Sequence, residues 1–385
     1  MRTAIIGAGA AGLAAAIEAA RFGQTVTLYE RMDRVGKKLL ATGNGRCNLM
    51  NTGPLLYPVG QSFAEKAFEA FSPKDLRLFF ESLGLGLREE AEGRVYPATG
   101  QAATVLNVLL NGLKRAGIEP LCGVKVSRVI PSNGGYLVDG VFFDKVILAS
   151  GGCAQPKLGS DGSGLDILKT LGHTVTAFSP CLTAMETDAA AIRGLSGLRI
   201  KADIRLEKSG RVLNAQSGEV LFADYGISGV CVMQLSAHYE KDAVAVLDLR
   251  RAMNIDEDAF SFFKKRQALL TSLAAKDFLT GLFATPLCSL LLKRAEVSDL
   301  SDDALLRLAD LVTAFSLPVL KLKGFEQAQL AKGGASLDEF SPSTMASKRL
   351  KGLYAVGELL DVAGDCGGFN LMFAFASGII AARHA

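Results

Sequence analysis

The sequence contains no tryptophan, only three histidines and no two cysteines in Cys-x-x-Cys spacing. The histidines, at positions 173, 238 and 384, are scattered among seven well-separated cysteines, which gives no cluster of the kind that holds a structural metal ion. We therefore expect no metal site. An odd number of cysteines without paired spacing also fits reduced thiols in a cytoplasm better than a disulfide framework.

The sequence also lacks a long apolar run and a large excess of charge of either sign. Its mean hydropathy is +0.26, but the strongest candidate for a membrane span, residues 281–292, is about half the required length and contains Pro286. A formal net charge of +3 with dispersed basic residues provides no patch for nucleic acid or an acidic membrane. We expect a cytoplasmic protein with a small-molecule substrate and no nucleic-acid or membrane partner. The sequence gives no indication of oligomeric state.

What the sequence does contain is a strand, turn, helix and strand pattern over residues 3–30. A short apolar run stops at Gly7-x-Gly9-x-x-Gly12, which opens an alanine-rich helix. Gly7 allows a tight turn, Gly9 leaves room for a pyrophosphate, and Gly12 lets the helix lie close to the strand. A second strand ends at Glu30, which follows Gly12 by 18 residues and is spaced to accept hydrogen bonds from an adenosine ribose. The pattern predicts a dinucleotide site.

Three other stretches suit the same ligand. Residues 35–48 interleave glycines with lysine, arginine and asparagine, which suits a polyanion, although a basic surface loop is the alternative. An apolar strand over 144–149 ends in Ser-Gly-Gly, which would bring bare backbone close to a ligand at the edge of a parallel sheet. A helix expected to begin at Gly368 could direct its N-terminus at the cofactor and stabilise negative charge there, unless it merely closes the fold.

The chain is predicted to be an α/β protein with two domains. Residues 1–185 and 321–385 are expected to form one discontinuous Rossmann-like domain, because the last strand and helix repeat the pattern at the beginning of the chain, an apolar strand followed by glycines and a helix. Residues 186–320 are expected to be an inserted second domain. Its β part, 186–255, shows alternating segments of an antiparallel sheet or barrel, and its helical part, 256–320, shows helical periodicity.

Several longer motifs resemble a known bacterial family. They are GAGAAGLAAA at the N-terminus, GKKLLATGNGRCN at 36–48, EEAEGRVYP at 89–97, ILASGG at 147–152, GEVLFADYGISG at 218–229 and GLYAVGELLDVAGDCGGFNLMFAFASG at 352–378. Together they are similar to NAD(P)/FAD-dependent oxidoreductases of the glutathione-reductase-like FAD-binding class, which include aminoacetone-oxidase-like and bile-acid-reductase-like members. The resemblance covers nearly the whole chain.

This resemblance implies that FAD is tightly bound by the discontinuous domain. The inserted domain would cover the flavin and shape the substrate pocket. The implied cofactor-binding residues are Gly7, Gly9, Ala10, Ala11, Gly12, Glu30, Arg31, Lys38, Leu39, Thr42, Gly43, Asn48, Val126, Gly151, Gly357, Glu358, Gly367, Gly368, Asn370 and Leu371.

The chain departs from the family at one motif. Where relatives commonly have Phe-Thr-His-Tyr-Gly, this chain has Phe-Ala-Asp-Tyr-Gly, with Asp224 in place of the histidine, so a relative's substrate does not transfer directly. Tyr225, Asp224 and Tyr96 are candidate proton donors or bases, with Arg94 as a charge partner, although a tyrosine is more often a packing residue. Cys366 is a weaker candidate, because no paired cysteine supports a disulfide-reductase mechanism.

The flavin would carry the redox chemistry while the protein supplies or removes a proton. We expect a reductase that transfers hydride to an unsaturated carbonyl compound, such as an enone of steroid or bile-acid type, with NAD(P)H as donor. No second nucleotide fingerprint is visible, so either NAD(P)H would bind only transiently or an electron-transfer protein would be the donor. The alternatives are an amine or amino-ketone oxidase that uses dioxygen and a non-catalytic FAD-binding redox sensor.

Overall fold

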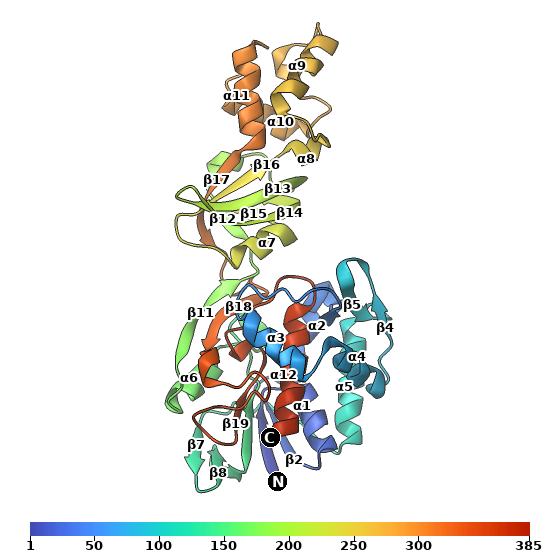
Figure 1. Cartoon of the computed structure of the whole chain (residues 1–385), viewed down its shortest axis with the longest axis vertical. Coiled ribbons are helices and arrows are strands. Elements are labelled where there is room, and N and C mark those ends of the chain that lie inside the picture. Colours follow the sequence, from blue (N-terminus) through green and yellow to red (C-terminus); the bar gives the residue numbers. More distant parts are fainter. The chain divides into compact units, whose positions relative to one another are not determined.

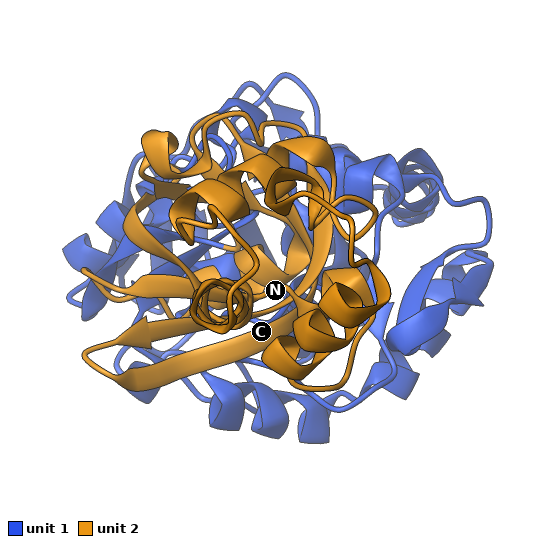
Figure 2. Ribbon diagram, turned by 90° about the horizontal axis from the view of Figure 1, so that it is seen from above, with its two compact units in different colours: residues 1–181, 325–385 blue, residues 182–324 orange.

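The computed structural model describes all residues 1–385, which divide into two compact units. Unit 1 comprises Met1–Cys181 and Phe325–Ala385, and unit 2 comprises Leu182–Gly324 (Figure 2). The chain thus leaves the first unit once and returns to it once. The predicted boundaries, at 185/186 and 320/321, lie slightly inside unit 2.

Unit 1 is built on a five-stranded parallel sheet. The strand order is β19-β10-β1-β2-β6, and Figure 1 labels two of these strands, β2 and β19. The bounds are Arg2–Ile6 for β1, Thr25–Glu30 for β2, Leu121–Cys122 for β6, Lys145–Leu148 for β10 and Leu353–Ala355 for β19. The central strand β1 has a nearly continuous apolar run because both faces of a parallel sheet are covered. This sheet confirms the predicted α/β class with a Rossmann-like domain.

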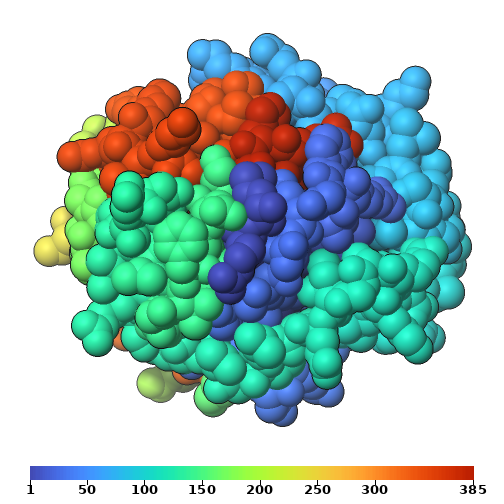
Figure 3. Space-filling model, turned by 90° about the horizontal axis from the view of Figure 1, so that it is seen from below, coloured from blue at the N-terminus to red at the C-terminus, as the bar shows by residue number.

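Unit 1 has seven α-helices. They are α1 (Ala10–Arg21), α2 (Lys37–Ala41), α3 (Gln61–Ala70), α4 (Pro73–Leu83), α5 (Ala102–Arg115), α6 (Ser163–Thr170) and α12 (Phe369–His384). The closest approach is between α1 and α12, where a Cβ added to Gly378 would lie 2.2 Å from the carbonyl oxygen of Ala11. The two chain ends also meet, since the side chain of Gln24 donates to the carbonyl of Ala385 and the amide of Thr25 donates to that of Met1. In Figure 3 the dark blue first residues and the dark red last residues lie side by side.

Unit 1 also contains three small antiparallel sheets. One has the order β3-β5-β4, with β3 at Met50–Asn51, β4 at Leu87–Glu89 and β5 at Arg94–Pro97. Another has the order β7-β8-β9, with bounds Val129–Ser132, Gly135–Val138 and Val141–Phe143. The third pairs β11 (Val175–Cys181) with β18 (Leu330–Ala335), the strands on either side of the unit 2 sequence.

Unit 2 is a closed barrel with helices. The barrel order is β12-β15-β14-β13-β16-β17, with bounds Met185–Thr187, Gly226–Ser228, Arg211–Ala223, Arg199–Lys208, Val244–Asp248 and Phe315–Leu322. The helices are α7 (Val230–Ser236), α8 (Arg250–Met253), α9 (Ala259–Leu269), α10 (Thr285–Arg294) and α11 (Asp302–Thr313). The predicted helical part, 256–320, is therefore wrong at its end. Residues from Phe315 onward alternate between buried and exposed, which is the period of a strand, and they close the barrel.

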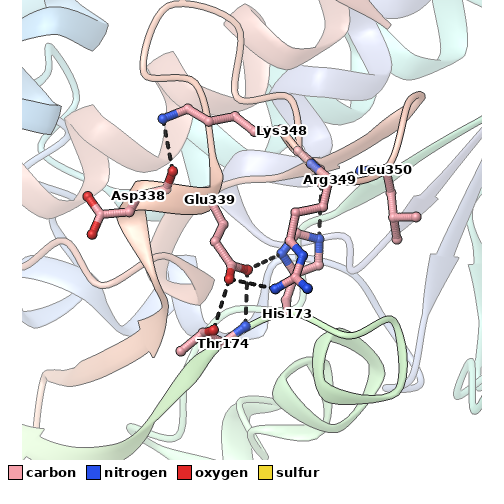
Figure 4. Close-up of polar contacts among 8 residues, drawn as sticks. His173, Thr174, Asp338, Glu339, Lys348, Arg349 and Leu350 are labelled. Carbon is pink, nitrogen blue, oxygen red and sulfur yellow. Dashed lines mark hydrogen bonds and ion pairs between the residues drawn. The ribbon is translucent and has the colours of Figure 1, made fainter.

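A polar cluster around the buried side chain of His173 joins the start of β11 to the segment after β18 in unit 1 (Figure 4). The Glu339 carboxylate accepts from the backbone amide and hydroxyl of Thr174, at 3.0 and 2.8 Å, and contacts Nδ1 of His173 at 2.7 Å. Arg349 also donates to this carboxylate, at 2.8 Å. Nε2 of His173 lies 3.0 Å from the hydroxyl of Ser347. The Glu339 carboxylate thus links the residues directly before β11 to the segment that follows β18.

Replacing Glu339 by glutamine is expected to destabilise the protein in a pH-dependent way. Burial alone would raise the pKa of Glu339, but hydrogen bonds from Thr174, His173 and Arg349 outweigh it and lower the pKa from 4.5 to about 2. The stabilisation is therefore complete above about pH 4.5 and is lost as the pH falls toward 2. At pH 7 the loss is expected to be about 2 kcal/mol, which lowers the Tm by about 4 to 8 °C.

Thermal unfolding at pH values from 7 down to 3 measures this difference. The difference in Tm between wild type and Glu339→Gln should shrink steadily below about pH 4.5, because Glu339 of the unfolded wild-type chain takes up a proton there while the folded protein keeps the carboxylate charged until about pH 2. Glu326→Gln is a matched control, because the Glu326 side chain is 62% exposed and its one ion pair is long, at 3.7 Å. A Tm difference that is the same at every pH would contradict a role for the charge.

Candidate functional site

A large cavity opens in unit 1 at the carboxyl ends of its parallel strands. Its wall includes the last residues of β1 and β2 and the residues that follow β10 and β19. This edge is where open α/β sheets bind ligands. The space between these residues is about 1360 Å³, including its opening to solvent.

The three glycines of the turn between β1 and α1 have different surroundings. A Cβ on Gly7, whose φ is +105°, would lie 2.5 Å from the carbonyl oxygen of Ala149, and one on Gly12 would lie 1.8 Å from that of Gly7. A Cβ on Gly9 would meet no protein atom within 4 Å. Protein packing therefore explains Gly7 and Gly12, whereas Gly9 keeps a part of the cavity wall open for a ligand.

The N-terminus of α1 suits an anion at the same place. No side chain caps this helix, and its first backbone hydrogen bond runs from Leu13 to Gly9 at 2.9 Å. The amides of the first turn therefore have no acceptor within the helix. Ala10 and Ala11, which belong to this turn, line the cavity. Free amides and the helix dipole both favour a phosphate group there.

Glu30 lies at the end of β2 and is 8% exposed. Its carboxylate oxygens accept from the backbone amides of Ala8 and Met32, at 2.9 and 2.8 Å. These bonds hold the side chain at the cavity wall, and each carboxylate oxygen can accept a further hydrogen bond. The geometry is compatible with ribose hydroxyl groups as donors.

An ion pair lies farther along the cavity, between Lys38 of α2 and Glu358 after β19. The two side chains are 2.6 Å apart and both are largely buried. The other carboxylate oxygen of Glu358 accepts from the amide of Ala331 on β18, at 2.9 Å. Lys38 is therefore held in place by a carboxylate that is itself fixed to the strand leading back from unit 2.

The start of α12 contributes another wall of the cavity. This helix is capped by Gly368 in the left-handed region, with no side-chain cap, so its first amides lack acceptors within the helix. Asn370 and Leu371 line the cavity. The Asn370 amide group, however, is bonded to the backbone of Gly364, at 2.8 and 2.7 Å, so it fixes the preceding loop. Burial, with smaller effects from nearby charges, raises the pKa of Cys366 to about 12, so its thiol stays protonated at neutral pH.

Two buried side-chain oxygens near this cavity have no hydrogen-bond partner: Asn48 Oδ1 and Ser150 Oγ. Ser150 belongs to the cavity wall. Asn48 Oδ1 lies beside the start of α12, 2.8 Å from the position of a Cβ on Gly368. Unsatisfied buried acceptors are uncommon in folded proteins, and a bound polar ligand is one explanation for them.

The structure brings most of the predicted cofactor-binding residues to one cavity. Its wall contains Gly7, Gly9, Ala10, Ala11, Glu30, Arg31, Lys38, Leu39, Thr42, Val126, Gly151, Gly357, Glu358, Asn370 and Leu371. Gly12, Gly43, Asn48, Gly367 and Gly368 are not part of the wall. Gly12 packs α1 onto the turn, while Gly43 and Gly368 lie against residues of the segment that contains Asn48.

The four predicted catalytic residues do not line this cavity. Tyr96 and Arg94 are on β5 of unit 1, where Tyr96 is buried under the guanidinium of Arg46, at 4.1 Å from the ring centre, and Arg94 pairs with Glu92. Asp224 and Tyr225 lie in unit 2, in the turn between β14 and β15. The ammonium of Lys323 is 4.4 Å from the ring centre of Tyr225.

Sequence reasoning missed some polar residues of the wall. Lys125, Ser160 and Asp161 all line the cavity but belong to segments without a nucleotide fingerprint. The run Gly-Ser-Asp-Gly-Ser-Gly at 159–164 was a usable signal, because flexible small residues with one carboxylate are typical of ligand-binding loops.

The similarity to known proteins extends over nearly the whole chain. The 3-dehydro-bile acid delta(4,6)-reductase of Clostridium scindens is 35% identical over 100% of this chain and 98% of its own length. The ribosomal RNA dihydrouridine synthase of Haemophilus influenzae is 27% identical over 97% and 95%, respectively. Among solved structures, the 3-ketosteroid-delta4-(5alpha)-dehydrogenase of Rhodococcus jostii RHA1 is 17% identical, covers 99% of this chain and 96% of its own, and has a TM-score of 0.48.

The fold, the family model and the similarity to the bile-acid reductase define an FAD-dependent oxidoreductase. The chain belongs to the family described as "HI0933-like protein Rossmann domain", whose model matches residues 1–384. The predicted class, cofactor and family resemblance are thereby confirmed. None of the helices combines the length and the apolar character that a membrane crossing requires.

Proposed function

We propose that the protein uses FAD to reduce a carbon–carbon double bond conjugated to a carbonyl group in a small apolar molecule, with NAD(P)H as the electron donor. The observation that carries this proposal is the 35% identity, over the full chain, to a reductase of 3-dehydro-bile acids. The name of that reductase describes reduction of double bonds at positions 4 and 6, which are conjugated with a 3-oxo group. None of the seven cysteines is in a disulfide, which supports a cytoplasmic location.

The cavity of unit 1 is where we place FAD. We propose that the turn at Gly9 and the start of α1 hold the diphosphate, that Glu30 binds the adenosine ribose, and that Lys38, Glu358 and the start of α12 lie beside the flavin half. FAD, when bound, supplies the capacity to accept and deliver a hydride. The free amides at the start of α12 would favour negative charge on the ring system.

Hydride addition to a conjugated double bond also requires a proton at the neighbouring carbon. A hydroxyl or carboxyl group of the protein can supply it. Our candidates remain Tyr225, Asp224 and Tyr96, with Arg94 as a charge partner. Tyr225 is our first choice because its ring is only partly buried and lies beside the cation of Lys323. Tyr225→Phe should lower kcat by roughly a hundredfold without changing flavin content, whereas Tyr96→Phe, at a buried position, tests the competing assignment.

The relative that acts on ribosomal RNA suggests a second substrate class with the same chemistry. Formation of dihydrouridine adds two hydrogens to a double bond that is conjugated to a carbonyl. We favour a small molecule because identity to the bile-acid reductase is higher, at 35% against 27%. Unit 2 also carries equal numbers of basic and acidic residues, whereas RNA binding usually needs a basic surface.

An anaerobic absorbance titration is the test of this function. NADH and then NADPH are added to the purified yellow protein, and a 3-oxo compound with conjugated double bonds at positions 4 and 6 follows. We expect one nucleotide to bleach the flavin and the dienone to restore its colour. Restoration by uridine-containing ribosomal RNA, but not by the dienone, would move the substrate to RNA. Bleaching by an amine, with recovery only in air, would support the oxidase alternative.

A further inference from the structure

Three charged residues of the cavity wall form one connected group. Asp161 is 2.8 Å from Arg31 and 3.0 Å from Lys125 in two ion pairs, both through its Oδ2 atom. Its Oδ1 atom accepts from the hydroxyl and amide of Ser163 at the start of α6, at 2.7 and 3.1 Å. One oxygen thus anchors the carboxylate to α6 while the other binds two cations. These contacts outweigh the effect of burial and lower the pKa of Asp161 to about 2.

The strand order shows what these ion pairs connect. Arg31 directly follows β2 and Lys125 lies shortly after β6, whereas Asp161 lies in the segment between β10 and α6. Since β10 and β2 are on opposite sides of β1, this segment must pass the carboxyl end of β1 to reach the cations. The glycine turn that follows β1 lies at that end. The ion pairs therefore join the two sides of the cavity across the turn.

Further contacts hold the segment between β10 and α6 against the end of β2. The side chain of Arg31 donates to the carbonyl of Gly159 at 3.3 Å, and a Cβ added to Gly159 would lie 3.0 Å from Cγ of Met32. Residues 158–161, 30–32 and 124–126 all belong to the cavity wall. Residues 159–161 are thus held against the ends of β2 and β6 by two ion pairs and a hydrogen bond.

We propose that Asp161, Arg31 and Lys125 form an ionic latch that must open before the adenosine half of FAD can enter or leave the cavity. The proposal rests on the placement of the adenosine beside Glu30 under the proposed function. The three side chains are between 25% and 55% exposed, so dissolved salt weakens the latch. A latch of this kind controls the rates of cofactor exchange more than the affinity, because opening is required in both directions.

The test is the kinetics of FAD binding to the apoprotein, followed by flavin fluorescence, for wild type and Asp161→Asn. Asparagine can still accept from Ser163 at the start of α6, so the helix end is preserved. At low salt we expect association and dissociation each to accelerate about fivefold to tenfold, while the Kd changes less than about threefold and the spectrum of bound flavin stays the same. High salt should accelerate exchange in wild type but scarcely in the variant.

Three further variants distinguish the latch from other effects of the substitution. Lys125→Met removes one ion pair and should accelerate both rates by a smaller factor, and Asp161→Glu should stay close to wild type. Asp166→Asn is the matched control, because that carboxylate lies on α6, is 81% exposed and does not line the cavity. Faster dissociation with slower association in Asp161→Asn would overturn the latch. It would mean that Asp161 instead holds the binding site in the shape that favours bound FAD. Unchanged rates would also overturn the latch.

The outcome for the latch can be separated from the outcome for the FAD site. If Gly9→Val still binds FAD, the assignment of the cavity fails and the latch fails with it. If Gly9→Val loses FAD while Asp161→Asn exchanges FAD at wild-type rates, the site stands and only the latch is wrong.

Discussion

Gly9→Val is expected to yield a folded but colourless protein. A side chain at this position meets no protein atom, and the backbone of Gly9, with φ of −83°, suits any residue. The new atoms would instead occupy the space in front of the free amides of α1, where we place the diphosphate. Stability should therefore change little, within about 1 kcal/mol, as for other substitutions that disturb no contact.

The flavin absorbance of the purified variant measures the loss of cofactor, and its circular dichroism spectrum and Tm, compared with wild-type apoprotein, measure the fold. Gly9→Ala is the graded comparison, because one methyl group should weaken FAD binding without preventing it. Full flavin occupancy in Gly9→Val would show that this turn does not hold the cofactor.

Gly378→Ala is expected to have the opposite effect, with lost stability as the primary change. The added methyl group would lie 2.2 Å from the carbonyl oxygen of Ala11 and 3.2 Å from its Cα, so α12 and α1 must move apart. Both are main-chain atoms of a helix, which cannot rotate away as a side chain can. We expect a loss of about 3 kcal/mol, which corresponds to a fall in Tm of about 6 to 12 °C.

Gly112→Ala provides the control for this substitution. It is also a helical glycine, in α5, but its added methyl group would meet the flexible end of the Ile17 side chain at 2.8 Å. Ile17 can adjust, and alanine favours a helix more than glycine does. A Tm close to or above that of wild type is therefore expected. Equal losses in the two variants would show that contact with main-chain atoms is not the cause.

The parts of the fold that depend on neighbouring residues were predictable from the sequence. The order of β1, α1 and β2 follows from apolar runs separated by glycines, and residues 2–30 fold as that pattern predicts. The strand β17 was missed because it follows the periodic helix α11 and contains Pro318, which is uncommon within a sheet. It becomes a strand by pairing with β12 and β16, which are distant in sequence.

The candidate site divides in the same way. Glycine spacing and the position of Glu30 indicated the nucleotide end of the cavity, because both act within one strand, turn and strand unit. Lys125 and Asp161 could not be assigned in this way, since their position at the cavity depends on the order of strands in the sheet. The predicted proton donors had no such local signal, and their assignment stays a prediction.

The insertion of unit 2 has a consequence for synthesis on the ribosome. Unit 1 cannot complete its sheet until β19 has emerged, and α1 has no α12 to pack against until the last residues are made. Residues 182–324, by contrast, are contiguous and have a closed barrel of their own. During translation the middle of the chain can therefore finish folding before the beginning does, and the nascent α1 must wait with the face that packs on α12 uncovered. The N-terminal segment is thus the part of the newborn chain most in need of protection by chaperones.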